Sequence, residues 1–227
     1  MRSSRALLSL TALLAFTPDP MVVVPLNSTN GLTLVGVTAA AVSYRGRDAV
    51  RLTVAPRPGA QTALENLALI DASAFRSGTI ELMVASTLAP DADTSARGFV
   101  GLAFHSTPDA SHFENIYLRP TNGRAREQLR RNHAVQYESL PDYPWDRLRH
   151  DAPGQYESYT DLRPAVWTRM RIVVDGARAQ LFVGDAQQPC LVVNDLKLGP
   201  TSGRIGLWIG PGTIGYFSRL SFTPAHP

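Results

Sequence analysis

The sequence predicts an all-β chain folded as a single-domain antiparallel β-sandwich. Short runs of alternating apolar and polar residues recur after residue 20, with turn residues between them. The 227 residues include 17 glycines and 17 prolines, which is typical of a protein with many turns. A helix of a turn or two is expected only at 126–133, and one domain of this length can enclose a two-sheet core.

The first half of the chain predicts four strands from period-two alternation. In the strand at 115–120, Ile116 and Leu118 alternate with Tyr117 and Arg119, so the two pairs belong to opposite faces. The expected strands are 48–54, 78–84, 98–105 and 115–120.

A hairpin is predicted where the strands 167–174 and 177–183 flank Asp175 and Gly176. Asp-Gly readily adopts the positive φ angles of a type I′ turn. The residues expected to face the core are Met170, Ile172, Val174, Ala179, Leu181 and Val183. Three further strands are expected at 190–195, 203–210 and 214–223, and the last should pair with an N-terminal strand.

Residues 1–20 resemble an export signal, with residues 21–227 forming the domain. Arg2 and Arg5 precede an apolar stretch that is too short to span a membrane, and no later stretch reaches the roughly 20 apolar residues of a membrane span. We therefore expect an exported, periplasmic or extracellular protein. The alternative is that Met21 is the true start.

Composition excludes several classes of site. Cys190 is the only cysteine, so neither an internal disulfide nor a cysteine-based zinc site is possible, and its apolar surroundings favour a buried packing role. The formal net charge of only +3 is smaller than the positive charge expected of a nucleic-acid-binding protein. We expect no cofactor and no metal, because His133 has no cluster of further ligands around it.

The order of several motifs resembles the concanavalin A-like lectin/glucanase superfamily. The motifs are "FRSGTIELMV", "GFVGLAFH", "WTRMRIVVDGARAQLFV" and "GRIGLWIGPGTIGYFSRLSF", and the pattern covers roughly residues 65–223. The likeness is greatest to the laminin-G-like and 3-keto-disaccharide-hydrolase-like branches. It implies two curved sheets, with a concave face that often holds sugars.

The chain departs from the glucanases of this superfamily at their paired carboxylates. The E-x-D-x-x-E strand that supplies nucleophile and acid/base is absent. Glu157 and Asp161 are four residues apart, about 13 Å along a strand. A retaining pair stands only about 5 Å apart, so these two residues do not form one.

The segment 119–150 is the most unusual part of the sequence, with seven arginines against four acidic residues. Its rings can stack on sugar C–H faces, and its arginine and amide groups can bind hydroxyl or anionic groups. We therefore predict a glycan, branched or anionic, bound on a concave face rimmed by 117–161. The candidate ligand-binding residues are Arg119, Asn122, Arg124, Arg131, Asn132, His133, Gln136, Tyr137, Tyr143, Trp145, Arg147, Tyr156 and Glu157.

Three alternatives stay open from the sequence. The first is a glycoside hydrolase or lyase, whose candidate catalytic residues are Glu157, His133 and Glu138. The second is a structural or adhesion module, in which the arginines pair with carboxylates to fix a long loop. The third is RNA binding, which the low net charge disfavours. The sequence predicts no oligomeric state.

Overall fold

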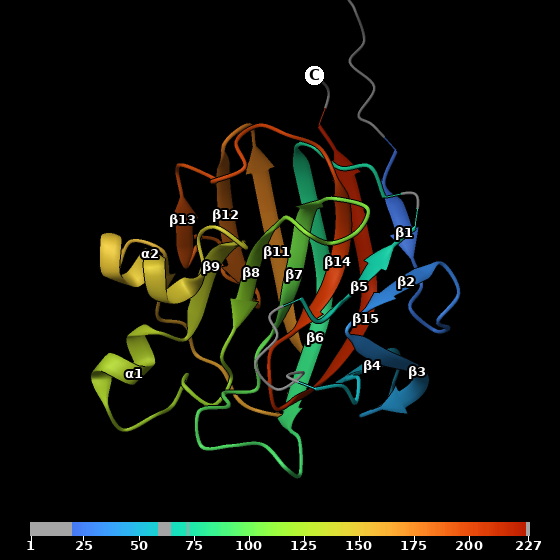
Figure 1. The fold of residues 1–227 in the computed structure, drawn as a ribbon, viewed down its shortest axis with the longest axis horizontal. Coiled ribbons are helices and arrows are strands. Elements are labelled where there is room, and N and C mark those ends of the chain that lie inside the picture. The colour runs from blue at the N-terminus through green and yellow to red at the C-terminus, as the bar shows by residue number, and fades with distance from the viewer. Residues whose placement is uncertain (1–19, 59–64, 72, 226–227) are drawn as a thin grey trace, which may run out of the picture.

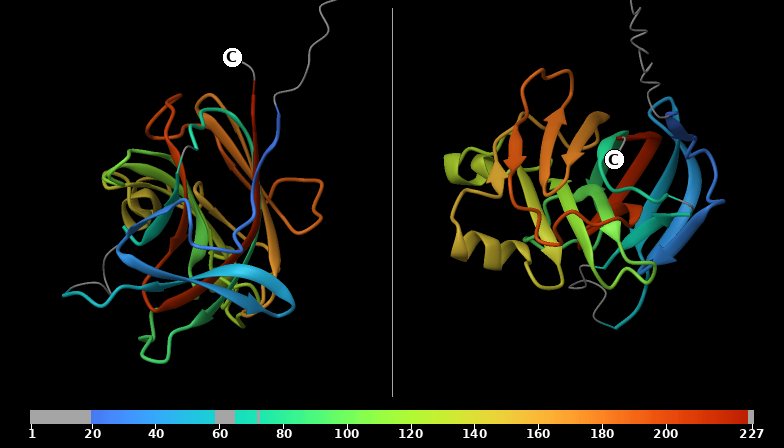
Figure 2. Two further views of the ribbon diagram at one scale, coloured as in Figure 1. Left: turned by 90° about the vertical axis from the view of Figure 1, so that its right-hand side faces the viewer. Right: turned by 90° about the horizontal axis from the view of Figure 1, so that it is seen from above.

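The computed structural model describes residues 20–58, 65–71 and 73–225, which form two antiparallel sheets packed face to face (Figures 1 and 2). The predicted all-β sandwich is therefore confirmed. The predicted export signal falls on residues 1–20 and lies, apart from its last residue, outside the described residues.

The first sheet has eight strands in the order β13-β12-β11-β6-β15-β4-β3, and β1 pairs with β15 beyond the end of β4. The pairing of the last strand with an N-terminal strand is as predicted. The strands are β1 (Val22–Val24), β3 (Val37–Tyr44), β4 (Arg47–Val54), β6 (Gly78–Leu88), β11 (Thr168–Asp175), β12 (Arg178–Val183), β13 (Leu191–Val193) and β15 (Thr213–Pro224).

The second sheet has seven strands in the order β10-β9-β8-β7-β14-β5-β2. These strands are β2 (Leu32–Val35), β5 (Leu67–Ile70), β7 (Val100–Ser106), β8 (Phe113–Leu118), β9 (Val135–Leu140), β10 (Glu157–Ser158) and β14 (Arg204–Ile209). Alternation sends one side of each strand into the core between the sheets and the other side outward. We call the side turned away from the first sheet the outer face.

The core between the sheets contains the residues that the alternation predicted. On β8, Ile116 and Leu118 are fully buried in it, whereas Tyr117 belongs to a second apolar cluster on the outer face. That second cluster also contains Leu67, Leu69, Ala103, Ala110, Phe113, Leu140 and Trp208. The seven-stranded sheet therefore has apolar clusters on both faces, and part of its outer face is buried from solvent.

The predicted hairpin is present, with its turn one residue later than expected. Asp175 still pairs with Arg178, so the two loop residues are Gly176 and Ala177. Of these two only Gly176 has a positive φ, +57°, as at the first position of a type II′ turn. Shifting the loop leaves the predicted core-facing residues of both strands buried.

Two short helices lie beside the β9 edge of the second sheet (Figure 1). α1 (Gln128–Asn132) falls within the stretch where a turn or two was predicted. α2 (Trp145–Asp151) was not predicted, because its seven residues bury only Leu148 and so show no helical period. Pro144 at its N-cap and Asp146 in its first turn are the signals that mark its start.

Candidate functional site: a pocket on the outer face of the second sheet

A pocket of about 590 Å³ opens on the outer face of the seven-stranded sheet. Strands β8, β9 and β14 form its floor. Its walls come from residues 93–99, from the connection between β8 and β9, and from α2. The polar segment singled out in the sequence therefore supplies much of one wall.

Aromatic rings line the floor, and two of them meet above a glycine on the strand between them. Across the sheet, Tyr117 on β8 pairs with Gly101 on β7, which pairs with Trp208 on β14. The absence of a side chain at Gly101 lets the Tyr117 and Trp208 rings approach to 4.8 Å between centroids. Phe99 packs edge-on against Tyr117 and continues the apolar floor.

Two apolar side chains flank the mouth of the pocket. Leu129 on α1 is 70% exposed, and Trp145 on α2 is 36% exposed. The Trp145 ring lies 4.7 Å from the guanidinium carbon of Arg149 and 5.8 Å from that of Arg119. These cation–π contacts fix the ring while leaving part of its surface to solvent.

Glu138 on β9 is fully buried at the floor of the pocket. The side-chain amide of Asn115 donates to its Oε1 at 2.9 Å, and its Oε2 has no hydrogen-bond partner among the described residues. Burial raises the pKa of Glu138 to about 7, although Asn115 and Arg119 oppose the shift. Burial therefore favours the protonated form of this carboxyl group near neutral pH.

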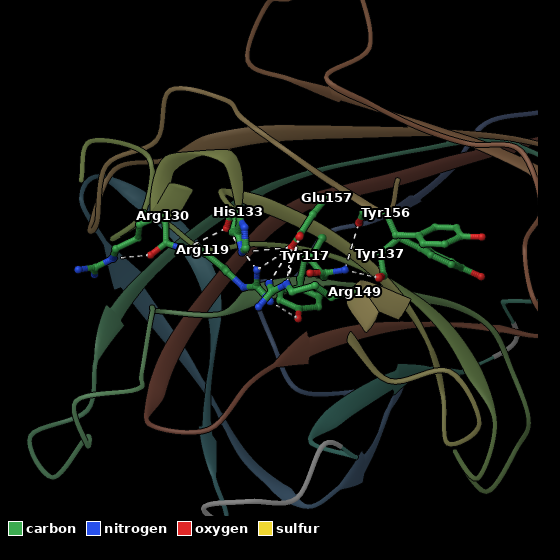
Figure 3. Close-up of polar contacts among 10 residues, drawn as sticks. Tyr117, Arg119, Arg130, His133, Tyr137, Arg149, Tyr156 and Glu157 are labelled. Carbon is green, nitrogen blue, oxygen red and sulfur yellow. Dashed lines mark hydrogen bonds and ion pairs between the residues drawn. The ribbon is translucent and has the colours of Figure 1, made fainter. Parts of the chain in front are cut away.

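Behind the pocket wall, three basic side chains converge on Glu157 (Figure 3). Arg149 donates from Nε to Oε1 at 3.1 Å and from Nη2 to Oε2 at 2.7 Å. Oε2 also lies 3.3 Å from His133 Nδ1 and 3.8 Å from Arg119 Nη1. Burial, with Arg149 and Arg119 nearby, holds the pKa of His133 below its ordinary value in spite of Glu157.

Some of the residues predicted to bind ligand do line the pocket. Arg119 is nearly buried, and it donates to the Tyr117 hydroxyl at 3.0 Å and to the backbone oxygen of His133 at 3.3 Å. Asn122 donates to the same backbone oxygen at 3.0 Å. The predicted residues that line the pocket are Arg119, Asn122, His133, Glu138 and Trp145.

Tyr137 and Tyr156 point away from Arg119 and Glu157 (Figure 3) and belong to the core between the sheets. The Tyr137 hydroxyl donates to Glu114 Oε2 at 2.7 Å and accepts from the backbone N–H of Lys197 at 2.8 Å. Because neighbouring positions on a strand face opposite ways, Tyr137 is excluded from the outer face that Glu138 occupies.

The other predicted residues are engaged elsewhere. Gln136 is buried and donates to the backbone oxygens of Tyr137 and Tyr156. Arg124 pairs with Asp161 on the surface. Gln128 holds both Arg131 and Asn132, and Arg147 stacks on Tyr143 at 4.4 Å. Glu157 supports the pocket through Arg149 without lining it. These residues make contacts within the protein and do not line this pocket.

Arg97, Phe99, Arg130 and Trp208 line the pocket but were absent from the predicted site. Phe99 and Trp208 sit in stretches whose alternation was recognised. Strand pairing across more than a hundred residues brings them together, and no local pattern reveals that pairing. The signal for Arg130 was its place in the arginine-rich segment; for Arg97 no signal is apparent.

In the described part of the chain, no group of three or more His, Cys, Asp or Glu side chains is placed to hold a metal ion. Among the same residues, none of the helices is long and apolar enough to cross a membrane. Cys190 is half-buried against the core, and burial raises the pKa of its thiol to about 11, so it stays protonated.

No protein-family profile and no curated protein matches the chain by sequence. Solved structures match it by fold. The carbohydrate-binding module CBM66 from Bacillus subtilis superposes with a TM-score of 0.58 at 14% identity, covering 85% of this chain and 96% of that one. A protein of unknown function with a galectin-like fold, also from Bacillus subtilis, gives 0.54 at 12% identity over 92% and 98%.

A lectin from Bauhinia forficata, solved in complex with GalNAc, gives a TM-score of 0.50 at 12% identity over 90% of this chain and 97% of the lectin. At these identities the likeness concerns the fold. Together with the two-sheet topology, it shows that the chain has the fold of the concanavalin A-like lectin/glucanase superfamily.

Proposed function

We propose that this protein binds a carbohydrate in the pocket on the outer face of the seven-stranded sheet. The observation that carries the proposal is that one pocket combines exposed apolar side chains with a buried acid that has an unsatisfied oxygen. Trp145 and Leu129 flank the mouth, and at the floor Glu138 Oε2 has no hydrogen-bond partner within the described part of the chain. A sugar presents both matching surfaces, since C–H patches stack on rings and hydroxyls pair with carboxyl oxygens.

The size and preorganisation of the pocket support the same proposal. A volume of about 590 Å³ lies within the range of small-ligand sites. Arg119 and Arg149 are fixed in place by Tyr117, His133 and Glu157, so little side-chain entropy is lost when a ligand binds. The fold is shared with a carbohydrate-binding module and a lectin, which adds support by analogy only.

Replacing the exposed ring tests the proposal. We expect Trp145→Ala to lose retention on the glycans that the wild-type protein binds in an array, while its thermal unfolding changes little. Tyr159→Ala is a matched control, because Tyr159 is also exposed but does not line the pocket. Equal retention by the wild-type and Trp145→Ala proteins, or failure of the wild-type protein to bind any glycan, would contradict the proposal.

Glycoside hydrolysis is the second candidate, and the protonation of Glu138 favours it. A general acid must hold a proton near neutral pH, as burial makes Glu138 do. The second carboxyl group would be Glu157, which pairs with Arg149 and does not line the pocket. Binding is preferred because, of the two candidate catalytic carboxyl groups, Glu138 alone lines the pocket, while Glu157 is occupied by Arg149.

An assay for new reducing ends separates the two candidates. If the protein hydrolyses a glycan that it binds, Glu138→Gln should abolish hydrolysis and keep binding, because glutamine retains the shape of the acid without its proton. A binding protein releases no reducing ends from any glycan that it retains. Turnover that survives in Glu138→Gln would rule out Glu138 as the acid.

A further inference from the structure

The arginines of the pocket are held mainly by neutral groups. Arg97 Nη1 donates to the backbone oxygens of Thr94 at 2.6 Å and Ala96 at 2.8 Å. Arg130 donates from Nε to Asn122 Oδ1 at 2.9 Å and makes a long contact from Nη2 to Thr121. Neither Arg97 nor Arg130 forms an ion pair within the described residues.

Arg119 completes the group of three, which we call the arginine trio (Arg97, Arg119 and Arg130). Its hydrogen bonds go to the Tyr117 hydroxyl and to the backbone oxygen of His133, and its carboxylate contact, with Glu157, is as long as 3.8 Å. That carboxylate is already bound closely by Arg149. Neutral acceptors orient the three guanidinium groups without neutralising them.

The three charges act on one another. Burial, together with Arg130 and Arg119, lowers the pKa of Arg97 below its ordinary value. The acidic residues of the lining compensate only in part. Asp93 accepts from the backbone N–H of Ser95, Glu127 forms no ion pair among the described residues, and burial raises the pKa of Glu138. With Arg149 counted, the lining holds four arginines against these three acids, so it has a formal excess of one positive charge.

Resting on the proposed function, we propose that the sugar bound in this pocket carries an anionic group, a carboxylate or a sulfate, which the arginine trio neutralises. Arg97 Nη2 and Arg130 Nη1 donate to no group among the described residues and are left for such a ligand. Guanidinium groups bind both kinds of anion through paired N–H donors. Contacts with Trp145 and Leu129 are not required for this discrimination, because charge alone separates an acidic sugar from its neutral form.

The test compares matched oligosaccharides in acidic and neutral forms. Oligouronates are measured beside their methyl esters, and sulfated oligosaccharides beside their desulfated forms, by calorimetry on the full-length wild-type protein. We expect an acidic form to bind at least about tenfold more tightly than its neutral counterpart, since hydrogen bonds to charged groups contribute about 1.5–3 kcal/mol. The preference should weaken as sodium chloride is raised.

Variants assign the preference to the arginine trio. Arg130→Gln should lower the affinity for the acidic form by about tenfold and leave that for the neutral form nearly unchanged, whereas Arg130→Lys, which keeps the charge, should lie between. Arg97→Gln should behave as Arg130→Gln does. Arg178→Gln removes the same charge from an exposed site on β12, outside the pocket, and should change neither affinity.

The outcomes separate this inference from the proposed function. Binding of neutral forms with no preference for acidic ones would overturn the inference and leave carbohydrate binding intact. A preference that persists in both glutamine variants would overturn the role of the arginine trio. Failure of every acidic and neutral form to bind would overturn both proposals.

Discussion

At the scale of single residues, Glu138 has the environment that most clearly separates function from packing. A carboxyl group that serves only stability is expected to have both oxygens satisfied when it is buried. Asn115 satisfies one oxygen of Glu138, and the other is buried with no hydrogen-bond partner among the described residues. Two charged neighbours act on its pKa in opposite directions: Arg119, which directly follows β8, opposes the rise, and Asp146 on α2 adds to it.

The raised pKa of Glu138 predicts a pH dependence of stability. The pKa is about 7 in the folded protein and 4.5 as the reference for an exposed glutamate. The contribution of this group to the free energy of unfolding is therefore fully present below pH 4.5, and that contribution is lost as the pH rises through 7. The shift corresponds to about 3 kcal/mol in the free energy of unfolding. Urea titrations between pH 4.5 and 8 measure it.

Glu138→Gln isolates the contribution of this group from the rest of the protein. Glutamine keeps an acceptor for Asn115 and cannot ionise. The free energy of unfolding of the variant should therefore increase relative to that of the wild type as the pH rises. Glu114, whose pKa burial also raises, is common to both proteins and cancels in the comparison. Parallel pH profiles for the two proteins would show that Glu138 is not buried as described.

Tyr137 illustrates the opposite case, a polar aromatic residue whose role is internal. Its hydroxyl joins Glu114 on β8 to the backbone of Lys197. We predict that Tyr137→Phe lowers the free energy of unfolding by about 1–3 kcal/mol, because two buried groups lose a partner. Glycan affinity should not change. Chemical denaturation and calorimetry on the same samples check both statements. A loss of glycan affinity without a loss of stability would show that Tyr137 contributes to binding.

At the scale of elements, β7 controls the floor of the pocket through Gly101. A Cβ at this position would lie 2.4 Å from Tyr117 Cβ and 2.5 Å from the Ile116 backbone oxygen, so β8 would have to move. We predict that Gly101→Ala costs about 1–3 kcal/mol in stability and weakens glycan binding by separating Tyr117 from Trp208. Both quantities can be measured by ligand-dependent thermal unfolding.

Gly154→Ala provides the comparison for that experiment. Gly154 has a φ of +76° and open space around its Cβ position, and it lies outside the pocket. Its substitution should cost only the backbone strain, about 1 kcal/mol, and leave binding unchanged. An equal effect of both substitutions on binding would mean that the contact between the Tyr117 and Trp208 rings does not shape the floor.

The predictability of each element follows from the range of the interactions that form it. Alternation of side chains is local, so the faces of β8, β11 and β12 could be predicted from the sequence. The hairpin turn was predicted one residue early, because register depends on the whole strand pair and not on the Asp-Gly dipeptide alone. α2 was missed because a helix that buries a single leucine has no periodic pattern to detect.

At the scale of the whole molecule, the sequence indicated part of the region that lines the pocket but not the set of lining residues. The arginine-rich segment does supply Arg119, His133 and Trp145 to the pocket. Its position in the chain could not reveal which of its side chains face the second sheet's outer side. The partners Arg97 and Trp208 come from distant segments that only the folded sandwich brings together.

The same sandwich separates binding from stability, because the pocket and the core lie on opposite faces of shared strands. Ile116 and Tyr117 are consecutive on β8, one in the core between the sheets and one at the pocket floor. A ligand that binds only the folded protein should raise the melting temperature by about 5–10 °C at about 100 times its Kd. Core and pocket variants should therefore respond to ligand differently.

We predict that Ile116→Ala lowers the free energy of unfolding by about 2–5 kcal/mol and still shows the full rise in melting temperature on adding ligand. Trp145→Ala should melt near the wild-type temperature without ligand and show almost no rise with it. The two variants thus fail in opposite ways, as expected if one face of β8 stabilises the fold while the other supports binding. A proportional loss of both properties in each variant would mean that the pocket forms part of the cooperative core.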